Sequence, residues 1–266
     1  MLIKKSSEYM RTFLTIALGF LLFSCQKTAK QTTTIDNLEA DTVSTIHKDK
    51  YPKDIFKVLE AHGGMQAFNQ MNTLIFELAN PEGAEKHSID LKNRYSRIET
   101  DKFVIGFDGN EAWIDQDSTY FKGDPRFYHN LMFYFYAMPF VLGDDGIQYQ
   151  EVTPLSFNGV AYPGYQISYE ANVGDSPDDN YFIYYDPETF KMKFLGYTVT
   201  YFSKEKSTTI SLIEYAEWKK ENGFLLPKTL KWRTFDKDSV GEVKSERVFE
   251  LIKIDNSKLD TALFKK

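Results

Sequence analysis

One uncharged segment restricts the fold more than any other feature of this sequence. Residues Phe127–Leu142, FYHNLMFYFYAMPFVL, contain no Lys, Arg, Asp or Glu over 16 positions. At helical spacing the apolar side chains cover more than one face, so a helix here must be buried on several sides or contact another apolar surface. Pro139 is predicted to end or kink that helix. Any fold of the chain therefore has to bury this segment or place it against an apolar partner.

Two interpretations of this segment stay open from the sequence alone. In the first, it is a core helix packed into the concave face of a sheet. In the second, it is a plug or lid over an apolar cavity, or a lip that contacts a membrane. Met and aromatic side chains suit adaptable apolar surfaces and packed cores equally well.

Strand-like segments separated by turn signals occupy most of the chain after Asn72. Turns are expected at Asp108-Gly109-Asn110, Asn158-Gly159 and Asn222-Gly223. Aromatic residues make up 16% of the chain and favour strands. The expected strands are Leu74–Leu78, Ser88–Leu91, Tyr95–Glu99, Phe103–Phe107, Ala112–Ile114, Thr119–Phe121, Tyr165–Tyr169, Tyr181–Tyr185, Leu195–Phe202, Thr209–Glu217, Lys228–Phe235 and Lys244–Ile254.

The resulting fold class is mainly β with flanking helices. Many strands with hairpin turns predict one large antiparallel sheet, curled or closed. A helix is expected over Pro52–Ala61 and a shorter one over Met65–Met71, with His62-Gly63-Gly64 ending the first.

The N-terminal residues have the pattern of an exported lipoprotein. A basic start precedes the apolar run Phe13–Phe23, which is too short to span a bilayer. The only cysteine, Cys25, follows Leu22-Phe23-Ser24. This pattern resembles a bacterial lipobox, which implies a signal peptide over residues 1–24, cleavage after Ser24 and lipidation of Cys25. The alternative is an ordinary secretory signal with a chance cysteine.

The expected domain organisation follows from this start. Residues 25–50 are predicted to be the lipidated cysteine and a polar, flexible tether, and residues 51–266 a single domain. Acyl chains would hold the protein at a membrane surface. We expect it in the bacterial cell envelope, facing the periplasm or the cell exterior, and in the outer membrane.

Composition and motifs exclude several functions. A formal net charge of −6 gives no reason to bind nucleic acid. Nucleotide-binding and hydrolase motifs are absent from the sequence, so no cofactor is expected. No two histidines have metal-ligand spacing, and the acidic stretches Asp144–Gly146 and Asp175–Asp179 are ordinary turn sequences, so no metal is expected.

Several ordered motifs together resemble the LolA/LolB-type lipoprotein-carrier superfamily. Asp108–Ile114 resembles its DG-x-x-x-W strand, Tyr185–Thr189 its D-P-x-T hairpin, and Asn222–Pro227 its later G-x-x-x-P strand entry. The resemblance covers roughly residues 52–254. It implies a highly curved antiparallel sheet that forms an incomplete barrel around an apolar cavity, with helices as a lid. In carriers of this fold the cavity takes acyl chains.

A second resemblance is to uncharacterised Gram-negative envelope lipoproteins, which form a domain of unknown function. They share the HGG helix end, His62–Gly64, and the RFYHNLMFYFYAMPF segment, Arg126–Phe140. This resemblance implies a fold and no reaction.

The sequence therefore predicts a non-enzymatic, membrane-anchored lipoprotein that binds or carries an apolar ligand, a lipid or lipoprotein acyl chains, in the concave face of its sheet. The residues expected to line or cover that site are Trp113, Phe133, Phe135, Met138 and Phe140. One alternative is a structural or interaction lipoprotein with a packed barrel and no ligand. A weaker alternative is an envelope hydrolase that uses Asp178 or Asp179 with His62 or His129.

Overall fold

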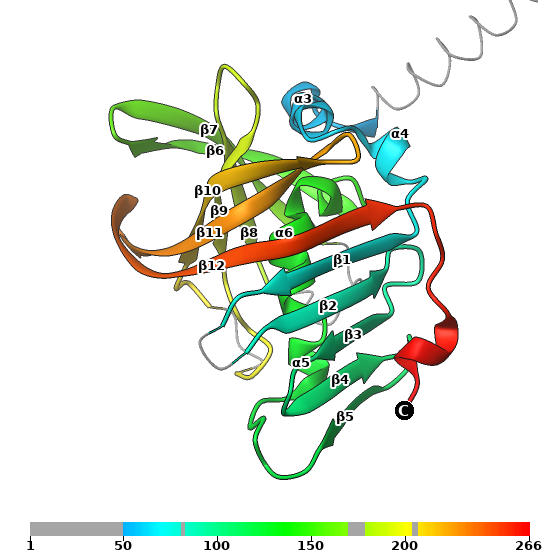
Figure 1. Cartoon of the computed structure of the whole chain (residues 1–266). Coiled ribbons are helices and arrows are strands. Elements are labelled where there is room, and N and C mark those ends of the chain that lie inside the picture. Colours follow the sequence, from blue (N-terminus) through cyan, green and yellow to red (C-terminus); the bar gives the residue numbers. More distant parts are fainter. Residues whose placement is uncertain (1–49, 81–82, 170–178, 204–206) are drawn as a thin grey trace, which may run out of the picture. The chain divides into compact units, whose positions relative to one another are not determined.

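Twelve antiparallel strands form one continuous sheet in the computed structural model of this chain (Figure 1). The structure describes residues 50–80, 83–169, 179–203 and 207–266. The predictions for the signal peptide, for Cys25 and for the tether up to residue 49 lie outside these ranges. The chain divides after Tyr51, and Pro52–Lys266 form the unit described below.

The sheet consists of two meanders joined side by side. The first comprises β1 (Thr73–Leu78), β2 (Glu85–Asp90), β3 (Ser96–Glu99), β4 (Phe103–Phe107) and β5 (Ala112–Gln116). The second comprises β6 (Ile147–Phe157), β7 (Val160–Tyr169), β8 (Tyr181–Tyr185), β9 (Met192–Tyr197), β10 (Ser211–Glu221), β11 (Phe224–Asp236) and β12 (Ser239–Asp255). β1 pairs with β12, and the outermost strands β5 and β6 do not pair with each other. The sheet is therefore open, as the predicted incomplete barrel requires.

β-Bulges bend the long strands of this sheet. Between Ile75 and Glu77 of β1, the facing part of β12 holds one extra residue. Leu251 lies at this bulge with φ of 44° and a side chain that is 69% exposed. Register shifts also interrupt the β10–β11 and β11–β12 pairs. Because a bulge bends its strand and increases the local twist, these irregularities help the sheet to curl around its inner face.

Four α-helices and one 3-10 turn accompany the strands in the described residues. They are α3 (Lys53–Ala61), α4 (Met65–Phe68), α5 (Pro125–Tyr128), α6 (Leu131–Val141) and η1 (Thr261–Phe264). His62-Gly63-Gly64 ends α3 as predicted, with positive φ angles of 121° at Gly63 and 80° at Gly64. The second helix is shorter than predicted and ends at Phe68 rather than Met71.

The uncharged segment lies on the concave side of the sheet. It contributes to two helices, α5 and α6, because the helical conformation is interrupted at His129 and Asn130. The Tyr136 ring on α6 lies 4.4 Å from Phe76 of β1 and 4.5 Å from Phe249 of β12. The ring of Phe140 lies 5.6 Å from Phe224 of β11. Of the two interpretations, the core helix is confirmed for α6, and Figure 1 shows it behind the front strands.

Of the two effects predicted for Pro139, to end or to kink the helix, the first does not occur. The helix continues through it to Val141. A proline has no N–H, so the carbonyl of Phe135, four residues earlier, loses its helical donor. The Tyr215 hydroxyl of β10 donates a hydrogen bond to this carbonyl at 2.6 Å. A tertiary contact therefore replaces the missing helical bond.

Three strand predictions need correction. Thr119–Phe121 is not a strand, because the Phe121 N–H donates to the side-chain oxygen of Gln116 at 2.8 Å instead of joining a ladder. The strand expected over Leu195–Phe202 ends at Tyr197. Strand β6 was not predicted. It contains Pro154, which an edge strand tolerates because one side of its backbone needs no partner.

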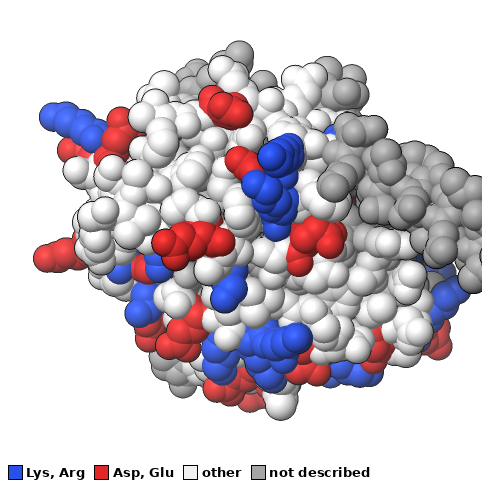
Figure 2. Space-filling view, turned by 90° about the horizontal axis from the view of Figure 1, so that it is seen from above, with Lys and Arg blue, Asp and Glu red and all other residues white. Residues whose placement is uncertain are grey.

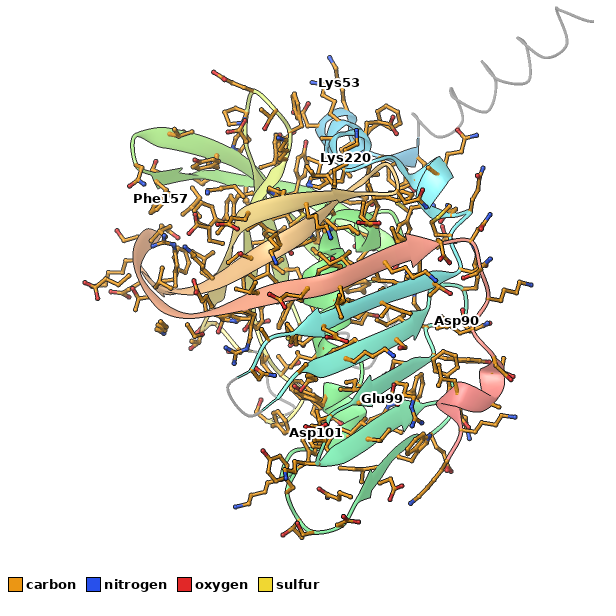
Figure 3. The ribbon with its side chains drawn as sticks, viewed as in Figure 1. Lys53, Asp90, Glu99, Asp101, Phe157 and Lys220 are labelled. Atoms are coloured by element: carbon orange, nitrogen blue, oxygen red, sulfur yellow. The ribbon has the colours of Figure 1, made fainter. Side chains whose placement is uncertain are left out.

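On the face shown in Figure 2, basic and acidic side chains are interspersed among uncharged ones without an extended patch of one sign. Lys53 and Lys220 are exposed examples, and Figure 3 shows side chains projecting from both faces of the sheet. None of the helices in the described ranges has the length and apolarity that crossing a bilayer requires.

Candidate functional site

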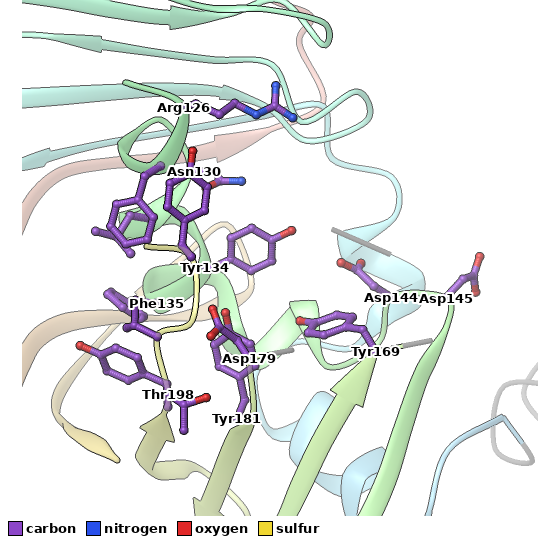
Figure 4. A pocket seen from close by; sticks show the side chains of 15 residues that line it. Arg126, Asn130, Tyr134, Phe135, Asp144, Asp145, Tyr169, Asp179, Tyr181 and Thr198 are labelled. Atoms are coloured by element: carbon purple, nitrogen blue, oxygen red, sulfur yellow. The ribbon is translucent and has the colours of Figure 1, made fainter. Parts of the chain in front are cut away.

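A cleft of about 230 Å³ opens beside the first turns of α6 (Figure 4). Its walls come from α5, α6, the residues just after α6, and the ends of β7, β8 and β9. The lining residues are Arg126, Phe127, Asn130, Leu131, Tyr134, Phe135, Asp144, Asp145, Tyr169, Asp179, Tyr181, Tyr197, Thr198, Val199 and Tyr201. The cleft thus combines aromatic surface with three carboxylates.

Helical spacing explains one wall. Asn130 and Tyr134 are four residues apart, and so are Leu131 and Phe135. These side chains therefore share one face at the start of α6. Phe135 also contacts the sheet, with its ring 4.8 Å from Tyr197 at the end of β9. This face of α6 is therefore turned toward the end of β9 and also toward Trp232 of β11, whose ring lies 5.8 Å from that of Phe135.

Strand pairing explains the opposite wall. β7 ends at Tyr169 and the adjacent strand β8 begins at Tyr181. Their rings meet edge to face at 6.0 Å. In Figure 4 the Tyr169 hydroxyl points toward Tyr181 and Asp179. Two tyrosines that are twelve positions apart in sequence are thereby held side by side.

Asp179 is a buried carboxylate in this wall. Its side chain is 6% exposed, and Oδ1 accepts a hydrogen bond from the Thr200 N–H at 2.6 Å. The neighbouring Asn180 N–H donates to Thr198 Oγ1 at 2.9 Å, and the Thr198 N–H donates to the Asn180 carbonyl at 3.0 Å. These bonds fix the segment after β9 against the entry to β8 and so shape the cleft.

The hydroxyls of Tyr169 and Tyr181 remain protonated at neutral pH. Burial raises the pKa of Tyr181, and the negative charge of Asp179 raises it further. Burial also raises the pKa of Tyr169, with smaller contributions from Tyr181, Tyr134 and Asp144. These hydroxyls can therefore donate or accept hydrogen bonds and carry no charge.

An exposed aromatic group lies at the rim of the cleft. Phe202 is 66% exposed, and its ring lies 4.8 Å from Phe127 and 5.1 Å from Tyr201. Phe127 and Tyr201 line the cleft themselves. The apolar lining therefore continues onto the surface.

Two further cavities adjoin the cleft. One of about 320 Å³ lies between α6 and the strands β11 and β12, and it shares Leu131, Phe135 and Tyr197 with the cleft. Another of only about 60 Å³ contains Phe133 and His129. The shared side chains place the two larger spaces on either side of the same part of α6.

Of the residues predicted to bind a ligand, Phe135 lines the cleft and Phe133 lines the 60 Å³ cavity. Met138 is 1% exposed and Phe140 is fully buried, and both belong to the core. Met138 and Phe140 line none of the cavities described above. Their contribution is to packing.

Trp113 lies on the other face of the sheet. Trp113 pairs with Gly106 of β4 and therefore shares its face of the sheet. Phe107, which follows Gly106 in β4, stacks on His129 at 4.1 Å, on the side of α5. Successive residues of a strand face opposite sides, so Trp113 faces away from α6. Its indole N–H donates to the Phe264 carbonyl at 2.8 Å. Trp113 is therefore no candidate for this cleft.

The residues of the hydrolase alternative do not share a cavity in the part of the chain that the structure describes. Asp179 lines the cleft, His129 lines the 60 Å³ cavity and accepts or donates a 3.2 Å hydrogen bond with Ser96, and Asp178 lies outside the described residues.

His62 is fully buried at the end of α3. Its Nδ1 lies 2.7 Å from the Val58 carbonyl, which can only accept, and its Nε2 accepts the Met192 N–H at 3.4 Å. Burial lowers the pKa of His62 to about 4. The His62 ring therefore acts as a neutral packing element.

Across the described residues, no group of three or more His, Cys, Asp or Glu side chains could hold a metal ion. Asp144 accepts two hydrogen bonds from Arg94, at 2.8 and 2.9 Å. Residues 175–178 of the second acidic stretch lie outside the described residues.

The predicted ligand site did not include the tyrosines of the cleft, and Asp179 was predicted only for the hydrolase alternative. A signal for them exists in the sequence, because the expected strands Tyr165–Tyr169 and Tyr181–Tyr185 are consecutive. If the two strands pair as a hairpin, the end of the first lies beside the start of the second. Tyr169 and Tyr181 would then be neighbours.

Together these elements define an open antiparallel half-barrel with a helix in its concave face and a cleft at one end of that helix. No protein-family model matches the sequence, and the curated proteins contain no match. Among solved structures, a LolA superfamily protein from Nitrosomonas europaea has 9% identity and a TM-score of 0.42, covering 79% of this chain and 96% of its own.

Two other solved structures are similar. A DUF1329 family protein from Desulfovibrio piger has 9% identity and a TM-score of 0.43, covering 80% of this chain and 95% of its own. An outer membrane lipoprotein-sorting protein domain from Vibrio parahaemolyticus has 8% identity and a TM-score of 0.37, covering 73% of this chain and 88% of its own. At these identities and TM-scores the three similarities assign no function or ligand to this chain.

Proposed function

We propose that this chain is a membrane-anchored envelope lipoprotein that binds an amphiphilic ligand, with a lipid or acyl chain as its apolar part, in the cleft beside α6. The lipobox-like pattern at Leu22–Cys25 supports the signal peptide and the anchor. The outer membrane is the location that we propose for this anchor. Residues 25–50 would then form the tether, and the function would be binding or carrying rather than catalysis.

The observation that carries the proposal is the contrast between a packed concave face and the open cleft. α6 fills the middle of the concave face, so this part of the half-barrel leaves no room for a ligand. The space beside the start of α6 is lined by Leu131, Phe135 and Val199 and is bordered by tyrosine hydroxyls. Ligand sites combine such apolar walls with a few polar groups.

The adjoining 320 Å³ cavity offers room for the rest of a chain. Leu131, Phe135 and Tyr197 line both spaces, so the cavity directly adjoins the cleft. Burial of the ligand's apolar surface would drive binding at roughly 25 cal/mol per Å².

The test uses the mature chain, residues 25–266, with Cys25→Ser to remove the acylation site. The purified protein is extracted for lipid mass spectrometry and titrated with a fluorescent fatty acid. We expect co-purifying lipid and saturable binding. Val199→Trp should fill the cleft and weaken binding by about tenfold or more, because Val199 lines it and is 38% exposed.

Val160→Trp is the matched control. Val160 is 37% exposed at the β6–β7 hairpin and lines none of the cavities described above, so binding should stay unchanged. If neither lipid nor fluorescent fatty acid binds the Cys25→Ser protein, the proposal is wrong.

A second candidate function has an observation in its favour. Nine residues of α6 are buried, which is what a structural or interaction lipoprotein with a packed half-barrel requires. Absence of lipid in the extract, together with capture of one protein partner by the full lipidated chain, would favour this function instead.

A further inference from the structure

The cavity of about 320 Å³ that adjoins the cleft combines apolar walls with a polar rim. Its described lining residues are Leu78, Asn80, Tyr128, Leu131, Met132, Phe135, Tyr197, Trp232, Ser245 and Arg247. Leu78 and Met132 are buried, whereas Ser245 and Arg247 are exposed. Arg247 carries the only charge among these described lining residues. The position of this charge therefore bears on the kind of polar group that the cavity can bind.

Strand register turns Arg247 toward the concave side of the sheet. Ser245 of β12 pairs with Trp232 of β11, whose ring lies 5.8 Å from that of Phe135 on α6. Ser245 therefore faces α6, and Arg247 and Phe249 follow on the same face at intervals of two residues. Phe249 is fully buried. The inner face of β12 thus changes from core to polar rim at Arg247.

The end of β1 brings an amide to the same rim. The Ala79 N–H donates to the Val248 carbonyl at 3.3 Å, so the chain continues beside β12 for the residues that follow β1 (Figure 1). Asn80 comes next and lines the cavity. The rim therefore gathers the Asn80 amide, the Ser245 hydroxyl and the Arg247 guanidinium, all of which can donate hydrogen bonds.

The Arg247 guanidinium has hydrogen-bonding capacity to spare. It donates to the Glu246 carbonyl at 2.9 Å and forms no ion pair with a carboxylate in the described ranges. The Glu246 carboxylate lies 4.0 Å from Lys231 Nζ, on the opposite face of the sheet. A guanidinium has five N–H donors, so most of them remain available to a ligand in the cavity.

The buried carboxylate nearest to the rim is held outside the lining. Glu85 accepts the Tyr128 hydroxyl at 2.9 Å and lies 2.7 Å from His87 Nε2, and it does not line the cavity. Burial and the Glu85 carboxylate raise the pKa of Tyr128, and the positive charge of Arg247 opposes them. Tyr128 therefore presents a neutral hydroxyl beside the positive charge.

A guanidinium on an otherwise uncharged rim suits anionic oxygens. Its planar fork matches the spacing of two oxygens of a carboxylate or phosphate group, and such charge-assisted hydrogen bonds are among the stronger ones in proteins. A partly enclosed site also screens this attraction less than open solvent does.

We propose that this cavity selects amphiphiles with an anionic oxygen head, a carboxylate or a phosphate, which Arg247 binds with Asn80 and Ser245 as further donors. The apolar chain of the ligand would lie along Trp232 and pass Phe135 toward the cleft. This inference rests on the proposed function, because it specifies the chemical class of the polar end of the same ligand.

The experiment compares four probes that share a dodecyl chain and differ in the head: dodecanoate, dodecyl phosphate, dodecyl maltoside and dodecyltrimethylammonium. Each is titrated below its micelle concentration into the mature Cys25→Ser protein by calorimetry, above neutral pH, where both acidic heads are ionised. We expect the two anionic probes to bind about tenfold more tightly than the maltoside, and the ammonium probe to bind most weakly. Salt should reduce this preference.

Arg247→Gln isolates the charge, because the side chain is exposed and glutamine keeps a hydrogen-bonding amide. It should weaken both anionic probes about tenfold and change maltoside binding less than about twofold. Arg247→Lys keeps the charge and should retain a preference for the anionic probes. Lys220→Gln is the matched control: Lys220 is exposed on β10 and lines none of the cavities described above, so all four affinities should stay unchanged.

The outcomes separate this inference from the proposed function. If the anionic probes bind no more tightly than the maltoside, or if their preference persists in Arg247→Gln, anion selection is wrong while amphiphile binding stands. If no probe binds, the proposed function fails and this inference fails with it. Displacement of dodecanoate by inorganic phosphate alone would indicate a soluble anion, and displacement only by phosphatidylglycerol vesicles would indicate a lipid headgroup; either supports anion selection.

Discussion

The two halves of α6 have the same uncharged composition and opposite surroundings. In the packed half, Tyr136–Val141, the rings of Tyr136 and Phe140 contact α4, β1, β11 and β12 at 4.2 to 5.6 Å. In the cleft half, Leu131–Phe135, the side chains of Leu131, Tyr134 and Phe135 border open space. Composition therefore does not decide which half is filled.

The difference comes from what faces each half. The packed half faces the helix α4 and the rings of Phe76 on β1, Phe224 on β11 and Phe249 on β12. The cleft half faces the places where β7 ends at Tyr169, β8 begins at Tyr181 and β9 ends at Tyr197. Strand ends leave gaps between them, and tyrosines at those ends give the gap its polar lining.

The largest expected effect comes from breaking the packed half. Phe140 is fully buried and stacks on Phe68 of α4 at 4.2 Å. Phe140→Ala should lower the free energy of unfolding by about 3–5 kcal/mol, because it removes the buried ring and leaves a cavity. Urea denaturation followed by tryptophan fluorescence measures the change.

Phe202→Ala is the matched control at the rim of the cleft. Because Phe202 is 66% exposed, its loss should change the free energy of unfolding by less than about 0.5 kcal/mol. Equal effects of the two substitutions would contradict the distinction between a packed half and a cleft half.

A pH titration tests the packed region in a second way. The His62 ring lies 4.7 Å from Trp218, and burial lowers its pKa to about 4 from 6.5. Between these values the unfolded chain binds more protons than the folded chain. The free energy of unfolding should therefore fall as the pH drops from 6.5 to 4, by about 3 kcal/mol from this residue.

His62→Gln supplies the comparison, since a glutamine can donate to the Val58 carbonyl and accept the Met192 N–H without titrating. Its stability should fall less over the same pH range, as measured by urea denaturation at pH 6.5 and 4.5. Carboxylates with lowered pKa values, such as Glu214, affect both proteins alike. Parallel pH profiles of the two proteins would show that His62 is not buried in its neutral form.

Local chemistry made the helix ends and turns predictable. Gly63 and Gly64 end α3, and Asn158-Gly159 forms a two-residue hairpin turn with φ angles of 49° and 79°. The pairing of β1 with β12 could not be predicted, because it joins strands at opposite ends of the domain and depends on the whole sheet. β6 was missed because Pro154 interrupts its strand pattern.

The site was predictable only in part. An all-apolar helix does not indicate which of its faces meets the sheet. Phe135, which borders the cleft, therefore could not be separated from Phe140, which is in the core. Trp113 was placed on the wrong face because its inward or outward direction depends on the register with β4. Tyr169 and Tyr181 become neighbours only once β7 pairs with β8.

The boundary between the two halves of α6 depends on one hydrogen bond. Pro139 removes the helical donor of the Phe135 carbonyl, and the Tyr215 hydroxyl replaces it at 2.6 Å. This bond fixes the last residue of the cleft half to β10. It therefore keeps Phe135 at the edge of the cleft while the residues after it pack against the sheet.

Tyr215→Phe should lower the free energy of unfolding by about 1–3 kcal/mol, because it leaves that buried carbonyl without a partner. In a Pro139→Ala background the restored N–H can donate to Phe135, so the same substitution should cost less, with a coupling energy of about 0.5 kcal/mol or more in a double-mutant cycle. Tyr136→Phe is the control, since the Tyr136 hydroxyl is buried and has no hydrogen-bond partner among the described residues. It should be neutral or stabilising, and additive effects of Tyr215→Phe and Pro139→Ala would contradict the role given to this bond.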